Sequence, residues 1–130
     1  MSRDEEVQLA LDGAWKDSVR LGPPEQAGYL YRVLGGRLAA AALGLKDTRT
    51  LQNWARGGVI KNAGQEHRLQ LLFRVTAMVE RVYTPAVAAA FLRGSNPLLD
   101  HRAPMLLIAD GPAPEVEAKV VAAAEALLEA

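Results

Sequence analysis

The sequence of 130 residues contains no cysteine, which excludes disulfide cross-links, cysteine-ligated zinc sites and thiol nucleophiles together. Its two histidines argue against a metal site, and we expect neither a metal nor another cofactor. No stretch approaches about 18 consecutive apolar residues, so we expect no membrane span. The N-terminus places Arg3 before three acidic residues and lacks the plan of a signal peptide. These absences favour a cytoplasmic protein.

Apolar residues are plentiful, at 50% of the chain, and can form a core without cross-links. No segment alternates between polar and apolar residues for long enough to predict a strand. Helical spacing recurs instead, so the predicted fold class is all-α. The predicted helices cover residues 26–34, 37–43, 65–83, 85–92 and 115–128, with one more beginning at Asp47 or Thr48.

Glycine and proline clusters divide the chain into three predicted regions. Residues 1–25 form an N-terminal arm with one weak helix, which Gly13 interrupts. Residues 26–63 form a helix-turn-helix module. Residues 64–130 form a helical region for partner binding and dimerisation, including a short irregular or helical stretch at residues 98–108.

Charge is unevenly distributed, although the net charge is zero. Residues 1–31 contain three basic and six acidic residues, a net charge of −3, and residues 82–130 contain the same numbers. Residues 32–81 contain nine basic and three acidic residues, a net charge of +6. A basic centre between acidic flanks indicates one surface for an anion and other surfaces for different partners.

Residues 37–54 have the parts of a helix-turn-helix. Ala40 is small enough for a close helix contact, and Gly44 can adopt the left-handed conformation that ends the first helix. The apolar residues that would pin the two helices together are Leu43, Leu45, Leu51 and Trp54. Counted from Gly44, the apolar residues of the second helix lie one residue later than in the commonest repressor spacing, so the turn is one residue longer. An ordinary helical hairpin is the alternative interpretation.

The exposed side of the second helix of this module carries side chains that can contact DNA. Arg49, Gln52 and Asn53 are the candidates for base contacts, while Lys46, Arg56 and Lys61 are the candidates for phosphate contacts. Such modules also act as scaffolds for protein contacts, so binding to promoter DNA is a separate hypothesis.

The segment 65–83 has apolar residues around more than half of its helical circumference. This arc exceeds what a few short helices are expected to cover, so we predict a homodimer. The predicted dimer interface is the stripe formed by Leu71, Val75, Met78 and Val82.

Residues 91–108, FLRGSNPLLDHRAPMLLI, contain the most specific pattern in the chain. An aromatic helix is followed by Asn-Pro, two leucines, an acidic residue, arginine and proline. This pattern resembles the toxin-binding region of the Xre/MbcA/ParS family of antitoxins, and the resemblance extends from Gln26 to the C-terminus. Residues 1–25 lie outside it.

The resemblance implies an all-helical, usually dimeric antitoxin that neutralises a RES-domain toxin, an enzyme that degrades NAD. It further implies that the C-terminal region occludes the active-site cleft of the toxin, and that the helix-turn-helix can bind the operon's own promoter. The implied toxin-binding residues are Asn96, Pro97, Leu99, Asp100, His101, Arg102 and Pro104.

Physically, Asn96-Pro97 predicts a sharp change of direction in this region. We expect five apolar residues to anchor the segment beneath the last helix: Leu98, Leu99, Pro104, Leu106 and Leu107. Asp100, His101 and Arg102 then remain as polar tips. Arg102 either pairs with a nearby carboxylate such as Asp100 or contacts the toxin directly.

An enzymatic function is not expected. Glu66-His67 and Asp100-His101 are the only adjacent pairs of acid and imidazole, and adjacent residues on a helix do not face each other. The leading hypothesis is therefore an antitoxin. A stand-alone helix-turn-helix regulator of transcription is the alternative, and a prophage or structural adaptor is a third.

Overall fold

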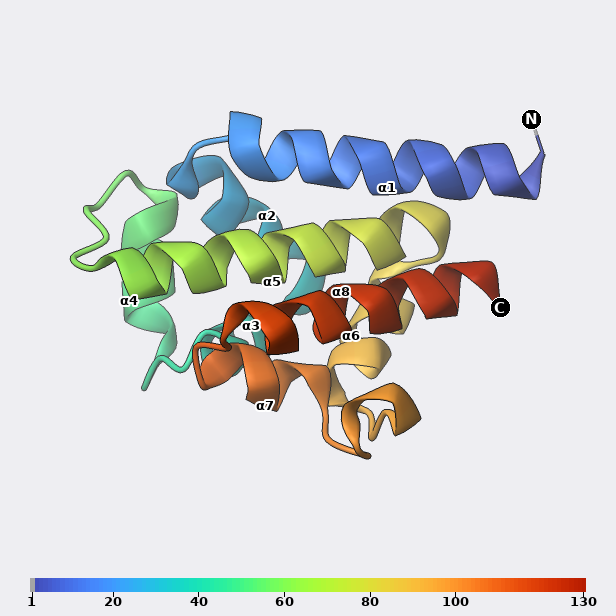
Figure 1. The fold of residues 1–130 in the computed structure, drawn as a ribbon. Helices are drawn as coiled ribbons and strands as arrows, with labels where there is room; N and C mark the ends of the chain where they lie inside the picture. The colour runs from blue at the N-terminus through green and yellow to red at the C-terminus, as the bar shows by residue number, and fades with distance from the viewer. Residues whose placement is uncertain (1) are drawn as a thin grey trace.

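Helix α5 (Ala63–Val82) lies at the centre of the computed structural model, which describes residues 2–130. Helix α1 (Arg3–Arg20) runs along one side of α5 and α8 (Pro114–Glu129) along the other, as Figure 1 shows. Helices α2 (Pro23–Leu34) and α6 (Pro85–Arg93) also pack against α5. The shorter segments are α3 (Gly36–Ala42), α4 (Thr48–Ala55), the 3-10 helix η1 (Pro97–Leu99) and α7 (Pro104–Ala109).

The all-α prediction is confirmed, because residues 2–130 contain helices and no β-strand. Each predicted helix is present, with ends within three residues of the predicted ones. None of the helices in this described part of the chain is long and apolar enough to cross a membrane.

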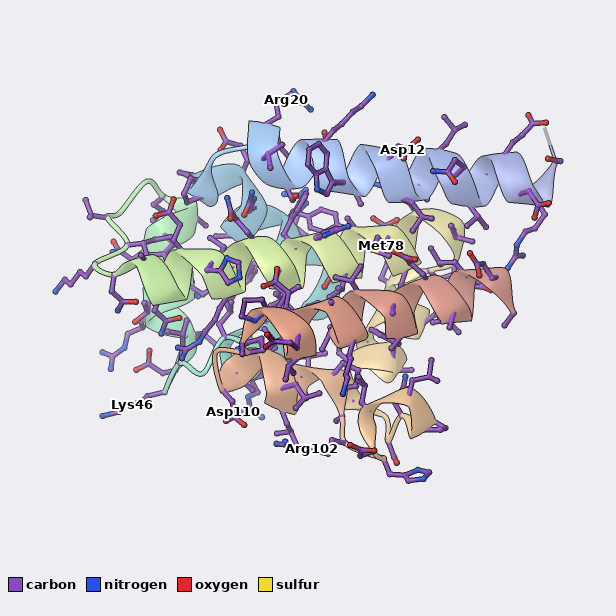
Figure 2. The ribbon with its side chains drawn as sticks, viewed as in Figure 1. Asp12, Arg20, Lys46, Met78, Arg102 and Asp110 are labelled. Carbon is purple, nitrogen blue, oxygen red and sulfur yellow. The ribbon has the colours of Figure 1, made fainter. Side chains whose placement is uncertain are left out.

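More of the apolar surface of α5 is buried within a single chain than the sequence led us to expect. Leu71, Val75 and Met78 are at most 2% exposed within a single chain, and Val82 is partly buried against the same core. Figure 2 labels Met78 on α5, between α1 and α8. The predicted dimer interface on this stripe is therefore wrong for this fold, because these side chains are already covered within one chain, where α5 contacts α1, α2, α6, α7 and α8.

Helix α1 corrects the prediction of an N-terminal arm whose one weak helix is interrupted at Gly13. It is one helix of 18 residues that continues through Gly13, and its Val7, Ala10 and Ala14 are buried against the rest of the molecule. Gly13 leaves room for Arg81 of α5, whose guanidinium would lie 3.1 Å from an added Cβ. That guanidinium donates a hydrogen bond of 2.6 Å to Asp17. The glycine thus serves a close helix contact and does not interrupt the helix.

Side-chain hydrogen bonds to other elements hold both ends of α1. The buried amide of Gln26 donates to the backbone oxygens of Ser18 and Leu21, both at 3.0 Å, and so satisfies carbonyls at the end of the helix. At the other end, Arg3 donates to the hydroxyl of Tyr83 at 2.6 Å and to the backbone oxygen of Leu128 at 3.0 Å. The first and last helices are thereby fastened together.

Prolines and polar caps explain where the other helices begin. Pro23, Pro85, Pro97, Pro104 and Pro114 each occupy the first helical position of a segment, where the missing N–H costs no hydrogen bond. Asp47, Asn62 and Thr84 accept backbone hydrogen bonds as N-caps of α4, α5 and α6. Of the two residues at which α4 was expected to begin, Asp47 is the N-cap and Thr48 is the first helical residue.

Candidate functional site

Helices α2, α3 and α4 pack on one another at one end of α5. Leu43, Leu51 and Trp54 are at most 4% exposed, and Leu45 packs against the same core. Gly44 has a φ of +73°, the left-handed conformation predicted for it, and an added Cβ there would lie 3.0 Å from the backbone oxygen of Ala109. The buried residues of this region are thus those that the sequence predicted, and they fix which side of α4 faces outward.

The outward side of α4 and its flanks form what we call the α4 surface. It contains the six predicted DNA-binding residues, Lys46, Arg49, Gln52, Asn53, Arg56 and Lys61, together with Asp47 and Tyr31, which contact them. All except Gln52 are exposed, and Gln52 is partly exposed and donates a hydrogen bond of 3.1 Å to the hydroxyl of Tyr31. Tyr31, from α2, is a member of this surface that the sequence reasoning missed.

Asp47 is an acidic residue within the α4 surface. The backbone N–H of Arg49 donates to its carboxylate at 3.0 Å, and the guanidinium of Arg49 lies 3.2 Å from its other oxygen. These contacts, the backbone bond foremost, hold the pKa of Asp47 below its usual value. A charged Asp47 therefore both caps α4 and orients Arg49, whose side chain remains 87% exposed.

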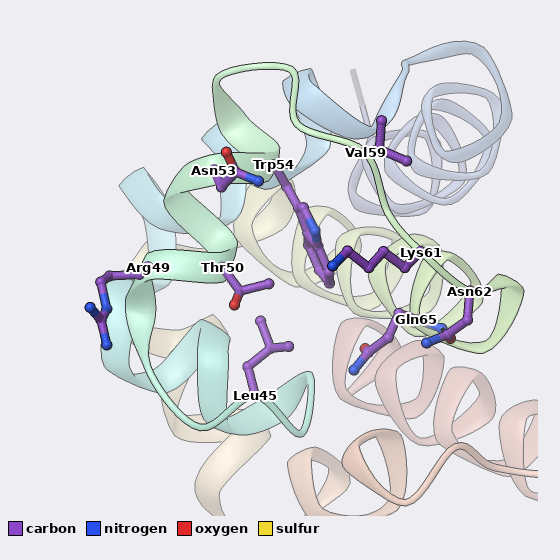
Figure 3. A pocket seen from close by; sticks show the side chains of 9 residues that line it. All are labelled: Leu45, Arg49, Thr50, Asn53, Trp54, Val59, Lys61, Asn62 and Gln65. Atoms are coloured by element: carbon purple, nitrogen blue, oxygen red, sulfur yellow. Dashed lines mark hydrogen bonds between the residues drawn. The ribbon is translucent and has the colours of Figure 1, made fainter.

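A groove of about 430 Å³ lies beside the α4 surface, between α4 and the chain that leads into α5. Figure 3 shows Lys61 extending across it toward Trp54, while Arg49 lies at its outer edge. The lining residues are Leu45, Arg49, Thr50, Asn53, Trp54, Val59, Lys61, Asn62 and Gln65. The charged members are both cations, so the groove suits an anionic group more than a cationic one.

The second candidate surface is the 95–102 loop, which connects α6 to α7 and contains η1. Asn96 closes the loop: its side chain accepts from the N–H of Leu98 at 2.9 Å and its backbone oxygen accepts from the N–H of His101 at 2.8 Å. The N–H of Asn96 donates to the backbone oxygen of Arg102 at 3.2 Å. The hydroxyl of Ser95 donates to the backbone oxygen of His101 at 2.9 Å. These bonds make the loop a compact element with a defined shape.

The tip of this loop has a strained backbone. Asp100 and His101 have φ angles of 54° and 62°, and each non-glycine residue in this region costs roughly 1–2 kcal/mol. Both side chains are exposed, as is that of Arg102, so the predicted polar tips are confirmed as exposed residues. Strain held by surrounding bonds at an exposed tip is typical of recognition sites.

The apolar residues of this region behave in two ways. Leu99 and Pro104 are buried, Leu107 is 9% exposed, and η1 contacts α8, as the sequence predicted. Leu98 and Leu106, which we expected beneath the last helix, are instead 58% and 53% exposed. The prediction for these two is wrong because η1 and α7 are short, and a single turn buries only one side of its residues.

The other predicted toxin-binding residues of this loop differ in exposure. Asn96 is partly buried and Pro97 is exposed. The guanidinium of Arg102 lies 3.4 Å from the carboxylate of Asp110, so its partner in the fold is Asp110 and not Asp100. Figure 2 shows Arg102 and Asp110 at the edge of the molecule away from α1. With side chains 52% and 70% exposed, this pair contributes less than about 1 kcal/mol and can be exchanged for another partner.

His67 lies apart from both surfaces. Its Nε2 is 2.6 Å from a carboxylate oxygen of Glu117 on α8, a contact that the sequence reasoning missed because it considered only the adjacent Glu66. Within residues 2–130, no three histidine, aspartate or glutamate side chains gather as they would around a metal ion.

No protein-family model, curated protein or solved structure was found to match this chain.

Proposed function

We propose that this protein is an antitoxin that binds a RES-domain, NAD-degrading toxin and occludes its active site. The observation that carries the proposal is the 95–102 loop, a strained and internally bonded element that presents Asp100, His101 and Arg102 to solvent. The chain itself performs no chemistry in this account and acts by stoichiometric binding.

Preorganisation supports the proposal. Ordering a flexible segment on binding costs about 0.5–1.5 kcal/mol for each immobilised side chain, in addition to the backbone cost. The hydrogen bonds around Asn96 already order the loop backbone in the free protein, so binding loses less backbone entropy. A loop of this kind suits a blocker that must fill the mouth of a cleft.

The chemistry of the surface supports it as well. Leu98 and Leu106 supply exposed apolar area next to the charged tips, a combination found in protein–protein interfaces. The Arg102–Asp110 pair is weak enough to open. The guanidinium of Arg102 and the carboxylates of Asp100 and Asp110 can then bind groups at the entrance of an NAD-binding cleft.

A test measures NAD consumption by the RES-domain enzyme encoded in the adjacent reading frame while the full chain is added. We expect complete inhibition near one chain per toxin active site. The variant Asp100→Asn, Arg102→Gln should weaken inhibition at least about tenfold, since asparagine tolerates a left-handed backbone and only charge is lost.

Glu25→Gln is the matched control, because Glu25 is exposed on α2, outside the loop. It should inhibit as the unaltered chain does. The proposal is wrong if the folded chain in molar excess leaves NAD consumption unchanged, or if no RES-domain enzyme is encoded beside it.

A second candidate function, transcriptional regulation through promoter DNA, is favoured by the α4 surface. Lys46, Arg49, Arg56 and Lys61 place four cations on and around an eight-residue helix. In this account α2 to α4 act as a helix-turn-helix, with Arg49, Gln52 and Asn53 near the bases.

DNA binding predicts a strong dependence of affinity on salt. Arg56→Gln should lower the slope of log affinity against log salt concentration by about one unit, whereas the control Arg93→Gln on α6 should leave it unchanged. Undetectable binding of the folded chain to its own promoter at low salt would assign these helices a scaffold role, without affecting the antitoxin proposal.

A further inference from the structure

The outward side of α1 carries a regular stripe formed by Leu9, Asp12, Lys16 and Val19. Their spacings of three, four and three residues place them on one side of a helix, as in the seam of a coiled coil. All four are exposed, and Leu9 and Val19 are 60% and 62% exposed. Two large apolar residues thus bracket an acid and a base.

This stripe lies opposite the buried side of α1. Val7, Ala10, Ala14 and Ser18 face the core, about half a turn from the stripe. Figure 1 shows α1 at the outer edge of the described chain, with α5 on its inner side. A second helix can therefore approach the stripe along the whole of α1.

The order of residues along the stripe is complementary to itself. When two α1 helices lie antiparallel and the two-fold axis crosses them at the level of residue 14, Leu9 of one copy meets Val19 of the other. In the same register Asp12 meets Lys16, and both contacts occur twice. The symmetric arrangement pairs apolar with apolar and acid with base at every position of the stripe.

We propose that this stripe is the interface through which two copies of the chain associate. Trp15, which is 51% exposed, flanks the stripe close to the axis and adds apolar area on the same side of both helices. Lys16 has no salt bridge within the described chain, and Asp12 accepts only a hydrogen bond of 2.9 Å from Gln8, so both charges are available to the second copy.

The interface leaves both candidate binding surfaces free. In Figure 1 the α4 helix lies at one end of α5, and η1 and α7 lie on the side of the molecule away from α1. The proposal is therefore independent of toxin and DNA binding, and it replaces the stripe on α5 as the dimer contact.

Charge exchange tests the pairing, with mass measured by sedimentation equilibrium between 1 and about 100 μM. We expect a dimer for the unaltered chain. Lys16→Asp and Asp12→Lys should each raise the dissociation constant at least about tenfold, because each places like charges opposite each other twice. The double variant, and an equimolar mixture of the two single variants, should restore the dimer.

Three outcomes would overturn the proposal: a monomer at every concentration, a dimer that neither single exchange weakens, or a double variant as weak as the single ones. Circular dichroism controls for folding, which these exposed positions should not disturb.

The register has its own test, because the natural chain has no cysteine. A mixture of Leu9→Cys and Val19→Cys chains should form a mixed disulfide on oxidation. Either variant alone should stay uncrosslinked, since two copies of residue 9 would lie about 15 Å apart along the helices at 1.5 Å per residue. Crosslinking of one variant with itself, or none in the mixture, contradicts this antiparallel pairing.

Discussion

Helices α1 and α5 both carry apolar residues on several sides, but these residues have opposite surroundings. On α5, Leu71, Val75 and Met78 are almost completely buried within one chain. On α1, Leu9 and Val19 remain mostly exposed. The difference comes from position: α5 is surrounded by α1, α2, α6, α7 and α8, whereas α1 has core contacts on one side only.

The width of the apolar arc alone therefore does not distinguish a core helix from an interface helix. The number of neighbours decides, and that number depends on tertiary arrangement. A helix of modest apolar content at the edge of a bundle can expose more apolar area than a strongly apolar helix at its centre.

The largest expected effect comes from placing the same substitution on both helices. Val75→Lys buries an unpaired charge where the valine is fully buried, and it should lower the free energy of unfolding by about 4 kcal/mol or more. Val19→Lys should change it by less than about 0.5 kcal/mol, because position 19 is exposed, but it should abolish self-association. Urea unfolding followed by circular dichroism measures the free energy of unfolding of both variants. Similar losses in the two variants would contradict the difference between the helices.

An intermediate effect is expected where α1 is fastened to α8. Tyr83→Phe removes a hydroxyl that donates to the backbone oxygen of Leu127 at 3.1 Å and accepts from Arg3. Its loss should cost about 1 kcal/mol, which lowers the midpoint of thermal unfolding by about 4 °C. Tyr31→Phe is the matched control, and its more exposed hydroxyl should matter less. Equal shifts would mean that the bonds between the two terminal helices add no more stability than the exposed Tyr31–Gln52 bond.

The smallest effect concerns the ion pair between α1 and α5. Arg20 and then Arg81 hold the pKa of Asp17 below its usual value of 3.8. A lowered folded-state pKa means that the stabilisation is complete at neutral pH and is lost as the pH falls through that pKa, below about pH 4. Relative to Asp17→Asn, the chain should gain less than about 1 kcal/mol at pH 7, and this gain should shrink as the pH is lowered below about 4. A difference that does not vary with pH would contradict this role.

Much of the fold was predictable because local rules decide it. Gly44, Asp47, Thr84 and the prolines at helix starts act through backbone geometry and hydrogen bonds that span a few residues. Gly13 was misinterpreted because its reason for being a glycine is Arg81, a residue far away in the sequence. The role of α1 in the core was missed for the same reason.

The candidate surfaces were predictable in part. The exposure of Asp100, His101 and Arg102 follows from a break in the chain flanked by anchoring leucines. Which leucines anchor it was not predictable, since Leu98 and Leu99 are adjacent and only the direction of η1 selects between them. The Tyr31–Gln52 and His67–Glu117 contacts join separate helices and leave no local signal.

Amide hydrogen exchange of the full chain, with and without the RES-domain enzyme, tests the proposal that the chain binds such a toxin through the 95–102 loop. The account predicts slower exchange on binding in residues 95–108, with little change in residues 46–61 of the α4 surface. Slower exchange confined to residues 46–61, with the 95–102 loop unaffected, would contradict it.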